Sequence, residues 1–286
     1  TDIAKLNYDN ADMRQEMERT MRFWLERGID GFRCDMACEV PIDFWRTTLP
    51  ALRRDYPQIF LLAEGEDPAL HEGAFDASYS WELHHLMNDI ARGKRGVAEL
   101  KEYLKKDAAN TPREAFRLMF TSNHDENSWA GSEFERMGDA ARVMALLTFT
   151  LPKGMPLIYT GQEIGYDHRF AFFEKDPVPQ WCENEFGEFY AALARLRHEH
   201  PALASGERGA EARYPAEGSL PDGVFGFTRG TGSDAVTVIA NLTAAEQEVG
   251  PTEGPLREFF TGQILSAGSR AVLPAWGWLV LTPEKE

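Results

Sequence analysis

Short apolar segments alternate with longer segments of helical periodicity through roughly the first 200 of the 286 residues. The clearest apolar segment lies within residues 58–66, where a continuous apolar run leads into two glutamates. Such a run is typical of a strand that is buried on both faces, as in a parallel sheet. Strands that alternate with helices form a parallel sheet, because each helix returns the chain to the edge where the next strand begins. The sequence therefore predicts an α/β fold with about five strand–helix units in residues 1–200.

The expected elements of this region follow from the same patterns. Strands are expected within residues 29–35, 58–66, 74–78, 115–121 and 156–159. Helical periodicity covers residues 12–27, 41–52, 81–91, 97–108, 139–151 and 185–199. Asp12 is the expected N-cap of the first helix. Pro50 is expected to bend or restart the second helix, because proline lacks an N–H group.

Residues 201–286 have a different character. Helical periodicity stops, and short β-type runs appear at residues 224–228, 235–240, 271–273 and 276–281, separated by Gly, Pro and Asp. We expect a small antiparallel β-sandwich that forms a second domain. Trp276 and Trp278 alternate on its last strand. They are expected to pack in the core, with a domain contact or a sugar platform as alternatives.

Composition excludes several classes of partner. The formal net charge of −16 argues against binding nucleic acid or an anionic membrane surface, since both need a positively charged face. A neutral substrate such as a sugar is compatible with this charge. The sequence contains no run of apolar residues long enough for a membrane-spanning helix. Its three cysteines do not have the spacing of a zinc site, so we expect free thiols.

Polar side chains follow the expected strands at their carboxyl ends. Arg33 and Asp35 lie two residues apart and should point to the same side of a strand. Glu64 follows the second strand, and His124 and Asp125 follow a later one. The carboxyl ends of parallel strands form one rim, where barrels and doubly wound sheets place their active sites. A structural ion pair between Arg33 and Asp35 is the alternative.

Three carboxylates on one rim suit the cleavage of a glycosidic bond. Retaining cleavage needs a nucleophilic carboxylate and a carboxylic acid about 5–5.5 Å apart. Arg33 beside Asp35 should keep Asp35 ionised, as a nucleophile requires. Glu64 follows apolar residues, which could raise its pKa and suit it to the acid role. A third carboxylate could hold sugar hydroxyls and favour the positive charge that develops on the sugar ring.

Four segments resemble the motifs of the α-amylase family of glycoside hydrolases, in the family's order: residues 31–37, 61–64, 120–125 and 154–163. The resemblance covers residues 2–199, and the sandwich fits the family's usual carboxyl-terminal domain. It implies a (β/α)8 TIM barrel and double displacement on the α-glucosidic bonds of α-glucans or maltooligosaccharides. It also implies a role for each site residue: Asp35 is the nucleophile, Glu64 the acid and base, and Asp125 the transition-state stabiliser, while Arg33 orients Asp35 and His124 binds substrate hydroxyls.

The sequence departs from the family pattern in two places. Cys38 and Glu39 stand where many amylases have a lysine–histidine pair, and the family's first motif, an asparagine–histidine pair, is absent. The strands present would be the fourth to the eighth, too few to close a barrel. We therefore expect an amino-terminal part or another chain to supply the other strands, and the exposed edge to promote self-association or low activity. Calcium could bind through that other part, but the residues named here require no metal.

Two alternatives to hydrolysis remain open from the sequence. The first is a non-catalytic, amylase-like glucan-binding or scaffolding protein, because fold does not determine activity. The second is a transglycosylase of the same family. His84, His85, His198 and His200 are expected to be ordinary surface residues. Glu163 is expected to tie the last strand of the barrel to its loop. Trp81 and Trp129 could stack on sugar rings, although most tryptophans simply pack.

Overall fold

The computed structural model describes residues 4–250 and 254–284. In this part of the chain the α-helices are α1 (Ala11–Leu25), α2 (Ile42–Asp55), α3 (Trp81–Ala91), α4 (Val97–Asn110), α5 (His124–Ala130), α6 (Glu133–Met137), α7 (Ala141–Thr150) and α8 (Glu185–Glu199). Short 3-10 helices are η1 (Ala37–Glu39), η2 (Pro68–His71), η3 (Gly138–Ala140), η4 (Gln162–Ile164), η5 (Pro201–Leu203), η6 (Gly206–Arg208) and η7 (Gly232–Asp234).

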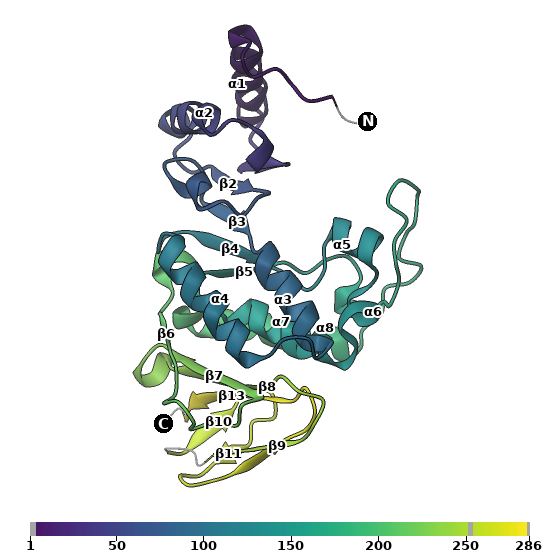
Figure 1. Cartoon of the computed structure of the whole chain (residues 1–286), viewed down its shortest axis with the longest axis vertical. Helices are drawn as coiled ribbons and strands as arrows, with labels where there is room; N and C mark the ends of the chain where they lie inside the picture. Colours follow the sequence, from purple (N-terminus) through teal and green to yellow (C-terminus); the bar gives the residue numbers. More distant parts are fainter. Residues whose placement is uncertain (1–3, 251–253, 285–286) are drawn as a thin grey trace.

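Five strands form a parallel sheet in the order β1-β2-β3-β4-β5, which confirms the predicted α/β fold. They are β1 (Gly31–Cys34), β2 (Phe60–Ala63), β3 (Ala77–Tyr79), β4 (Phe116–Met119) and β5 (Gly154–Pro156). Figure 1 shows the sheet in the middle of an elongated molecule, with α1 and α2 at one end. Because every pair is parallel, all five carboxyl ends lie at the same edge. In the described residues β1 and β5 are the outer strands of an open sheet.

Two of these strands lie slightly away from the positions predicted. β3 covers residues 77–79 rather than 74–78, and β5 covers residues 154–156 rather than 156–159. Pairing explains the shift of β5, because Gly154 aligns with Arg117 and the Arg117 amide bonds to the carbonyl of Lys153 at 2.9 Å. The apolar stretch that follows therefore continues past the paired segment toward the rim.

The prediction for the start of the first helix was wrong, and one for the second helix was partly so. Asn10, not Asp12, is the N-cap of α1, because its side chain accepts hydrogen bonds from the amides of Asp12 and Met13. Pro50 does not restart α2, which continues through it to Asp55, and a bend of the helix at Pro50 stays a prediction. A proline inside a helix removes one backbone hydrogen bond, but packing of the buried Leu49 and Leu52 on either side holds the helix together.

The remaining strands form antiparallel sheets, as predicted. A six-stranded sheet has the order β11-β10-β13-β8-β7-β6, and β9 pairs with β12 in a second, two-stranded sheet. The strands are β6 (Ala212–Arg213), β7 (Val224–Arg229), β8 (Val236–Asn241), β9 (Gln247–Val249), β10 (Leu256–Glu258), β11 (Ile264–Leu265), β12 (Ala271–Leu273) and β13 (Trp278–Pro283). The position of the domain boundary near residue 200 stays a prediction.

One hydrophobic core joins the helices to the antiparallel sheet. It contains buried side chains of α3, α4, α7 and α8 together with those of β7, β8 and β13. Trp276 and Trp278 both pack against this core, and the Trp278 ring lies 5.6 Å from that of Phe189 in α8. Trp276 has a left-handed backbone (φ 57°) and precedes β13, so the two tryptophans do not alternate within one strand. Trp278 therefore joins the antiparallel sheet to α8, two elements that Figure 1 shows in neighbouring parts of the molecule.

Cys34, Cys38 and Cys182 are free, as predicted. Burial raises the pKa of the Cys34 thiol to about 12, so this side chain stays protonated beside the carboxyl end of β1. In residues 4–250 and 254–284, every helix is too short or too polar to cross a lipid bilayer.

Candidate active site

The chain turns sharply just after β1, at Met36. Met36 has a left-handed backbone conformation (φ 46°, ψ 43°), which is uncommon for a residue other than glycine. This turn directs the Met36 amide at Glu64, whose Oε2 accepts its hydrogen bond at 2.9 Å. The carbonyl of Glu64 in turn accepts from the amide of Ala37 at 2.9 Å. Strained backbone of this kind is often held in place at functional sites.

The guanidinium group of Arg33 connects two of the three carboxylates. Its Nη1 lies 2.5 Å from Oδ1 of Asp35, and its Nη2 lies 2.8 Å from Oε1 of Glu64. Its Nε donates to the hydroxyl of Tyr79 at 3.2 Å. The structure thus brings Arg33, Asp35 and Glu64 together at the ends of neighbouring strands. Arg33 pairs with both carboxylates rather than with Asp35 alone, which extends the simple ion pair considered from the sequence.

The two carboxyl groups have different surroundings and opposite pKa shifts. The hydrogen bond from Arg33 lowers the pKa of Asp35, whose side chain is 68% exposed. Burial raises the pKa of Glu64, whose side chain is only 10% exposed. The two carboxyl groups also interact directly, which lowers the pKa of Asp35 and raises that of Glu64. One group is therefore favoured as an anion and the other as an acid.

His124 and Asp125 lie in the first turn of α5 rather than at the end of a strand. Asn123 caps this helix and accepts hydrogen bonds from the amides of Asp125 and Glu126 at 3.0 and 2.8 Å. Nε2 of His124 is 3.4 Å from Oδ2 of Asp125. His124 also contributes, after Arg33, to the lowered pKa of Asp35. Helix α5 therefore presents both residues to the rim that carries Asp35.

Tyr79 is a site residue that the sequence analysis missed. It lies at the end of β3, next to the strand of Glu64, and binds Arg33 through its hydroxyl. Burial raises its pKa, and the negative charges of Glu64 and Asp125 act in the same direction. The signal was weak, because β3 is only three residues long and Tyr79 lay outside the range predicted for it.

His84 is buried against the first turn of α5, so the prediction that it is a surface residue was wrong. The side chain is fully buried, and Nε2 lies 2.9 Å from Oε2 of Glu126. Nδ1 lies 3.2 Å from the carbonyl oxygen of Phe120. His84, His85 and Glu126 offer possible metal-ligand atoms within 4.8 Å of one another. However, His84 already makes hydrogen bonds through both ring nitrogens, so its clearest role is to fix α5.

Two further expectations need correction. His200 is buried, with its Nδ1 3.7 Å from a carboxylate oxygen of Asp234, whereas His198 is exposed as predicted. Oε2 of Glu163 is buried and has no hydrogen-bond partner among the described residues. Gln162 ties the end of the barrel strand instead, because its Oε1 accepts from the amide of Tyr159 at 2.6 Å.

A buried glutamate lies beneath the part of the rim formed after β4 and β5. Glu133 accepts a hydrogen bond from the hydroxyl of Thr121 at 2.9 Å and also contacts the amide of Gln162. Gln162 additionally donates to the hydroxyl of Tyr190 at 3.1 Å. Burial raises the pKa of Glu133 to about 7, so its protonation changes near neutral pH. Glu133 lies within a polar segment, and so no local pattern marked it as buried.

We expect Glu133→Gln to flatten the dependence of stability on pH. The Glu133 pKa is higher in the folded protein than in the unfolded chain, so its contribution to the free energy of unfolding is fully present below about pH 4.5. It is lost as the pH rises through about 7. At pH 8 the variant should be more stable than the natural protein by up to about 3 kcal/mol, with little difference at pH 5. Urea unfolding measured across this range tests the expectation.

Glu188→Gln is the matched control, since Glu188 is an exposed glutamate on α8. It should leave the slope of stability against pH close to that of the natural protein. An equal slope in Glu133→Gln and the natural protein would show that Glu133 does not titrate as described.

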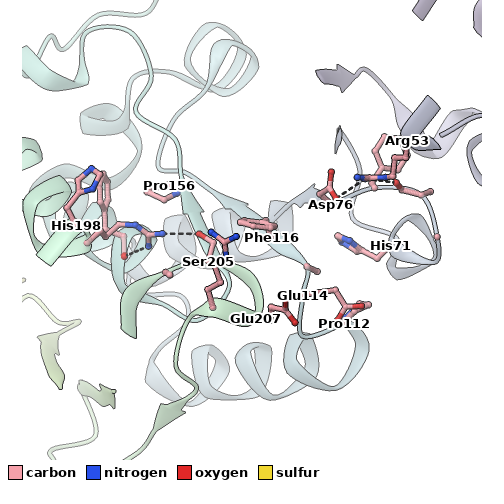
Figure 2. A pocket seen from close by; sticks show the side chains of 18 of the residues that line it. Arg53, His71, Asp76, Pro112, Glu114, Phe116, Pro156, His198, Ser205 and Glu207 are labelled. Carbon is pink, nitrogen blue, oxygen red and sulfur yellow. Dashed lines mark hydrogen bonds and ion pairs between the residues drawn. The ribbon is translucent and has the colours of Figure 1, made fainter. Parts of the chain in front are cut away.

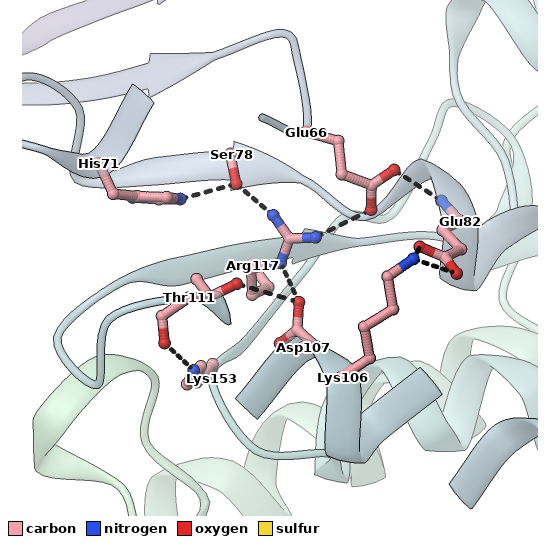
Figure 3. A network of polar contacts seen from close by, with 9 residues as sticks. All are labelled: Glu66, His71, Ser78, Glu82, Lys106, Asp107, Thr111, Arg117 and Lys153. Atoms are coloured by element: carbon pink, nitrogen blue, oxygen red, sulfur yellow. Dashed lines mark hydrogen bonds and ion pairs between the residues drawn. The ribbon is translucent and has the colours of Figure 1, made fainter. Parts of the chain in front are cut away.

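A second polar network fixes the strands on the side of the sheet that faces the helices (Figure 3). Arg117 of β4 is 3% exposed and contacts the hydroxyl of Ser78 in β3. It also lies 2.9 Å from Oε1 of Glu66 and 3.0 Å from Oδ1 of Asp107. Glu66 follows Glu64 by two residues, so this network also restrains the end of β2. Removing one partner would leave a buried charge without compensation.

A cavity of about 990 Å³ lies away from these residues, at the amino ends of β3 and β4 (Figure 2). Arg53, His71, Asp76, Phe116 and Ser205 are among the residues that line it. Arg33, Asp35, Glu64, His124 and Asp125 are not. In parallel α/β sheets, ligand sites lie at the carboxyl ends of the strands. We therefore place the candidate active site at the carboxyl rim and not in this cavity.

Comparison with known proteins decides the family. Residues 1–195 match the model of the alpha amylase catalytic domain. The chain belongs to the α-amylase family. This α-amylase family protein is 29% identical over 255 residues to the alpha-amylase MalA of Haloarcula japonica. The alignment covers 88% of this chain and 37% of the relative. It is 30% identical over 218 residues to a cyclomaltodextrinase of a Bacillus species, covering 71% and 38% of the two chains.

Solved structures support the fold. The maltogenic alpha-amylase AmyB of Thermotoga neapolitana superposes with a TM-score of 0.82 at 24% identity, covering 100% of this chain and 69% of that one. An alpha-amylase of Geobacillus thermoleovorans, complexed with acarbose, gives 0.79 at 21% identity, with coverages of 98% and 66%. These matches confirm the predicted incomplete barrel followed by an antiparallel β part. The chain spans less than half the length of the two curated relatives named above.

Proposed function

We propose that this α-amylase family protein is a retaining glycoside hydrolase that cleaves the α-glucosidic bonds of α-glucans or maltooligosaccharides. The observation that carries the proposal is the pairing of Asp35 and Glu64 through the single guanidinium group of Arg33. Two carboxyl groups that bind one guanidinium group fit the spacing of about 5–5.5 Å in a retaining enzyme better than the roughly 6.5–9.5 Å that leaves room for a water in an inverting one. Their opposite pKa shifts supply one anion and one acid.

In the first step the Asp35 carboxylate attacks the anomeric carbon of the bound glucose unit. The glycosidic oxygen takes the proton of Glu64 as its bond to carbon breaks, and the departing chain leaves as an alcohol. The amide of Met36 holds Glu64 in place, and Arg33 keeps Asp35 ionised for the attack. The product of this step is a glycosyl ester on Asp35.

In the second step the ionised Glu64 takes a proton from water, and the oxygen of that water attacks the anomeric carbon. The bond to Asp35 breaks, and both carboxyl groups return to their starting states. Asp125 is proposed to stabilise the positive charge on the sugar ring, and His124 to bind sugar hydroxyls. The exposure of Asp35 at the rim, with its side chain 68% accessible, leaves room for a sugar to approach.

The open sheet defines the condition under which this chemistry should operate. A closed barrel has eight strands, and the described residues supply five. We propose that activity requires a partner surface along the outer strands β1 and β5, supplied by other residues of the same protein or by another chain. Calcium, if it is required, is proposed to act through that partner surface.

The stereochemistry of the product tests the proposal. With the protein as its gene encodes it, proton NMR of maltooligosaccharide cleavage should show the α-anomer of the new reducing end first, because two inversions give net retention. Appearance of the β-anomer first would contradict double displacement. Products longer than the substrate would indicate that a sugar replaces water in the second step, the transglycosylase alternative. Glucan binding without any product would favour the non-catalytic alternative.

A further inference from the structure

A cleft of about 970 Å³ lies between the two antiparallel sheets, at the end of the molecule opposite to α1 and α2 (Figure 1). The smaller sheet contributes Val249 of β9 and Ala271 of β12 to its lining. From the larger sheet, alternate residues of β7, β8 and β13 line it: Gly226, Thr228, Thr237, Ile239, Leu279 and Leu281. We call this space the sandwich cleft. The residues between them, such as Val238 and Val280, point to the opposite face and pack in the core with the helices.

The apolar side chains of the sandwich cleft are incompletely covered. Ile239 and Leu279 are paired across β8 and β13, and both are only partly buried, as is Leu256 of β10. In a complete β-sandwich the side chains of two facing sheets interdigitate and fill the space between them. Here the facing sheet has only β9 and β12, each three residues long. The space that remains has the volume of a small-molecule site.

Polar residues form one row at an end of the sandwich cleft. Arg213 of β6 is paired with Thr228 of β7, which is paired in turn with Thr237 of β8. Paired residues of antiparallel strands point to the same face, and the two threonine hydroxyls are 2.8 Å apart. Arg213 donates to the carbonyl of Gly230 at 2.6 Å and forms no ion pair with another described residue. A guanidinium group has five N–H donors, so donors remain for a ligand.

Charge and length limit what the sandwich cleft can hold. Arg213 is the only charged residue among the described residues that line it, in a chain whose net charge is −16. The next row of the sheet, Gly226, Ile239 and Leu279, is apolar. From β6 to β10 the cleft crosses four strand spacings, about 19 Å in all. A ligand that matches these features has one anionic group and a long apolar body.

We propose that the sandwich cleft binds an aliphatic carboxylate, the anion of a fatty acid. Its carboxylate accepts hydrogen bonds from Arg213, and its alkyl chain covers Ile239 and Leu279. An α-glucan chain fits this cleft less well, because its hydroxyl groups would lie against apolar side chains that offer no hydrogen bonds. The site shares no residue with the candidate active site, so this inference stands apart from the proposed function.

Isothermal titration calorimetry with the protein as its gene encodes it tests this proposal. Decanoate should bind about tenfold more tightly than octanoate, because two further methylene groups are buried. Arg213→Gln should raise the Kd for octanoate about five- to tenfold and that for 1-octanol, which has no charge, less than about twofold. Ile239→Trp places a larger side chain in the cleft and should weaken the binding of all three ligands at least about tenfold.

Arg257→Gln is the matched control. Arg257 is an exposed arginine of the same sheet that also donates to a backbone carbonyl, that of Gly262 at 3.2 Å. It follows the cleft residue Leu256, so it points to the other face of β10, and its loss should change no Kd. Circular dichroism of each variant shows whether the fold is intact.

Three results would overturn the proposal. The first is a natural protein that binds no decanoate, or that binds octanoate no better than Arg213→Gln does. The second is displacement of decanoate by maltotriose, because the sandwich cleft would then be a sugar site. The third is self-association in sedimentation that Ile239→Trp prevents, because the cleft would then hold a second copy of the chain.

Discussion

Asp35→Asn is expected to lower kcat for maltooligosaccharide cleavage by about four orders of magnitude or more. Asparagine has nearly the same shape as aspartate, so the fold should be preserved. Its amide cannot form the glycosyl ester, and it loses the charge that Arg33 neutralises at 2.5 Å. Initial rates measured with the protein as its gene encodes it, at saturating substrate, give the size of the effect.

Asp43→Asn provides the same chemical change away from the rim. Asp43 is on α2, its side chain is 64% exposed, and it pairs with Arg14 at 2.6 Å. Exposed ion pairs contribute little to stability, so kcat and the unfolding midpoint should stay close to those of the natural protein. A kcat for Asp35→Asn within tenfold of the natural protein, with the fold intact, would remove Asp35 from the nucleophile role.

Arg229→Met is expected to lower the free energy of unfolding by about 3–5 kcal/mol, the largest stability effect that we predict. Arg229 of β7 is 1% exposed, and its guanidinium donates to four backbone carbonyls, those of Thr150, Leu151, Ala204 and Ala210, at 2.7–3.1 Å. Two of these carbonyls are at the carboxyl end of α7, where a positive charge is favourable. Burial lowers the pKa of Arg229 to about 10, so it stays charged at neutral pH.

Methionine has a similar length but no donor, so the variant leaves buried carbonyl oxygens without partners. Because two of these hydrogen bonds join β7 to the end of α7, losing them should also weaken the packing of the antiparallel sheet against the helices. Urea unfolding followed by far-ultraviolet circular dichroism measures the change. Arg270→Met is the matched control, since Arg270 is 68% exposed and pairs with Glu248 at the surface. Equal unfolding midpoints for the two variants would contradict the role given to Arg229.

The order of elements and the convergence of Arg33, Asp35 and Glu64 could be predicted because both depend on short-range patterns. Continuous apolar runs identified the buried strands, and the parallel arrangement then placed their carboxyl ends on one rim. The two-residue spacing of Arg33 and Asp35 placed both on the same side of the chain. The periodicity of a strand and the topology of the sheet are therefore enough to bring these three residues together.

Contacts that depend on tertiary packing could not be predicted in the same way. His84 is adjacent to the exposed His85, and only the position of α5 shows that it is buried against Glu126. Glu133 lies in a polar segment that is typical of a protein surface, yet its side chain is buried in contact with Thr121 and Gln162. The partners of such groups are distant in the sequence, so local patterns carry no information about them.

During turnover we expect Asp35 to become covalently bonded to the sugar. A glucosyl fluoride with fluorine at carbon 2 or 5 slows the release of this intermediate, so that mass spectrometry of peptides from the treated protein can identify the labelled residue. We predict that one glycosyl group is attached to the peptide that contains Asp35, and that Asp35→Asn prevents the labelling. A label on another carboxylate, or cleavage of the fluoride without any covalent adduct, would contradict this account.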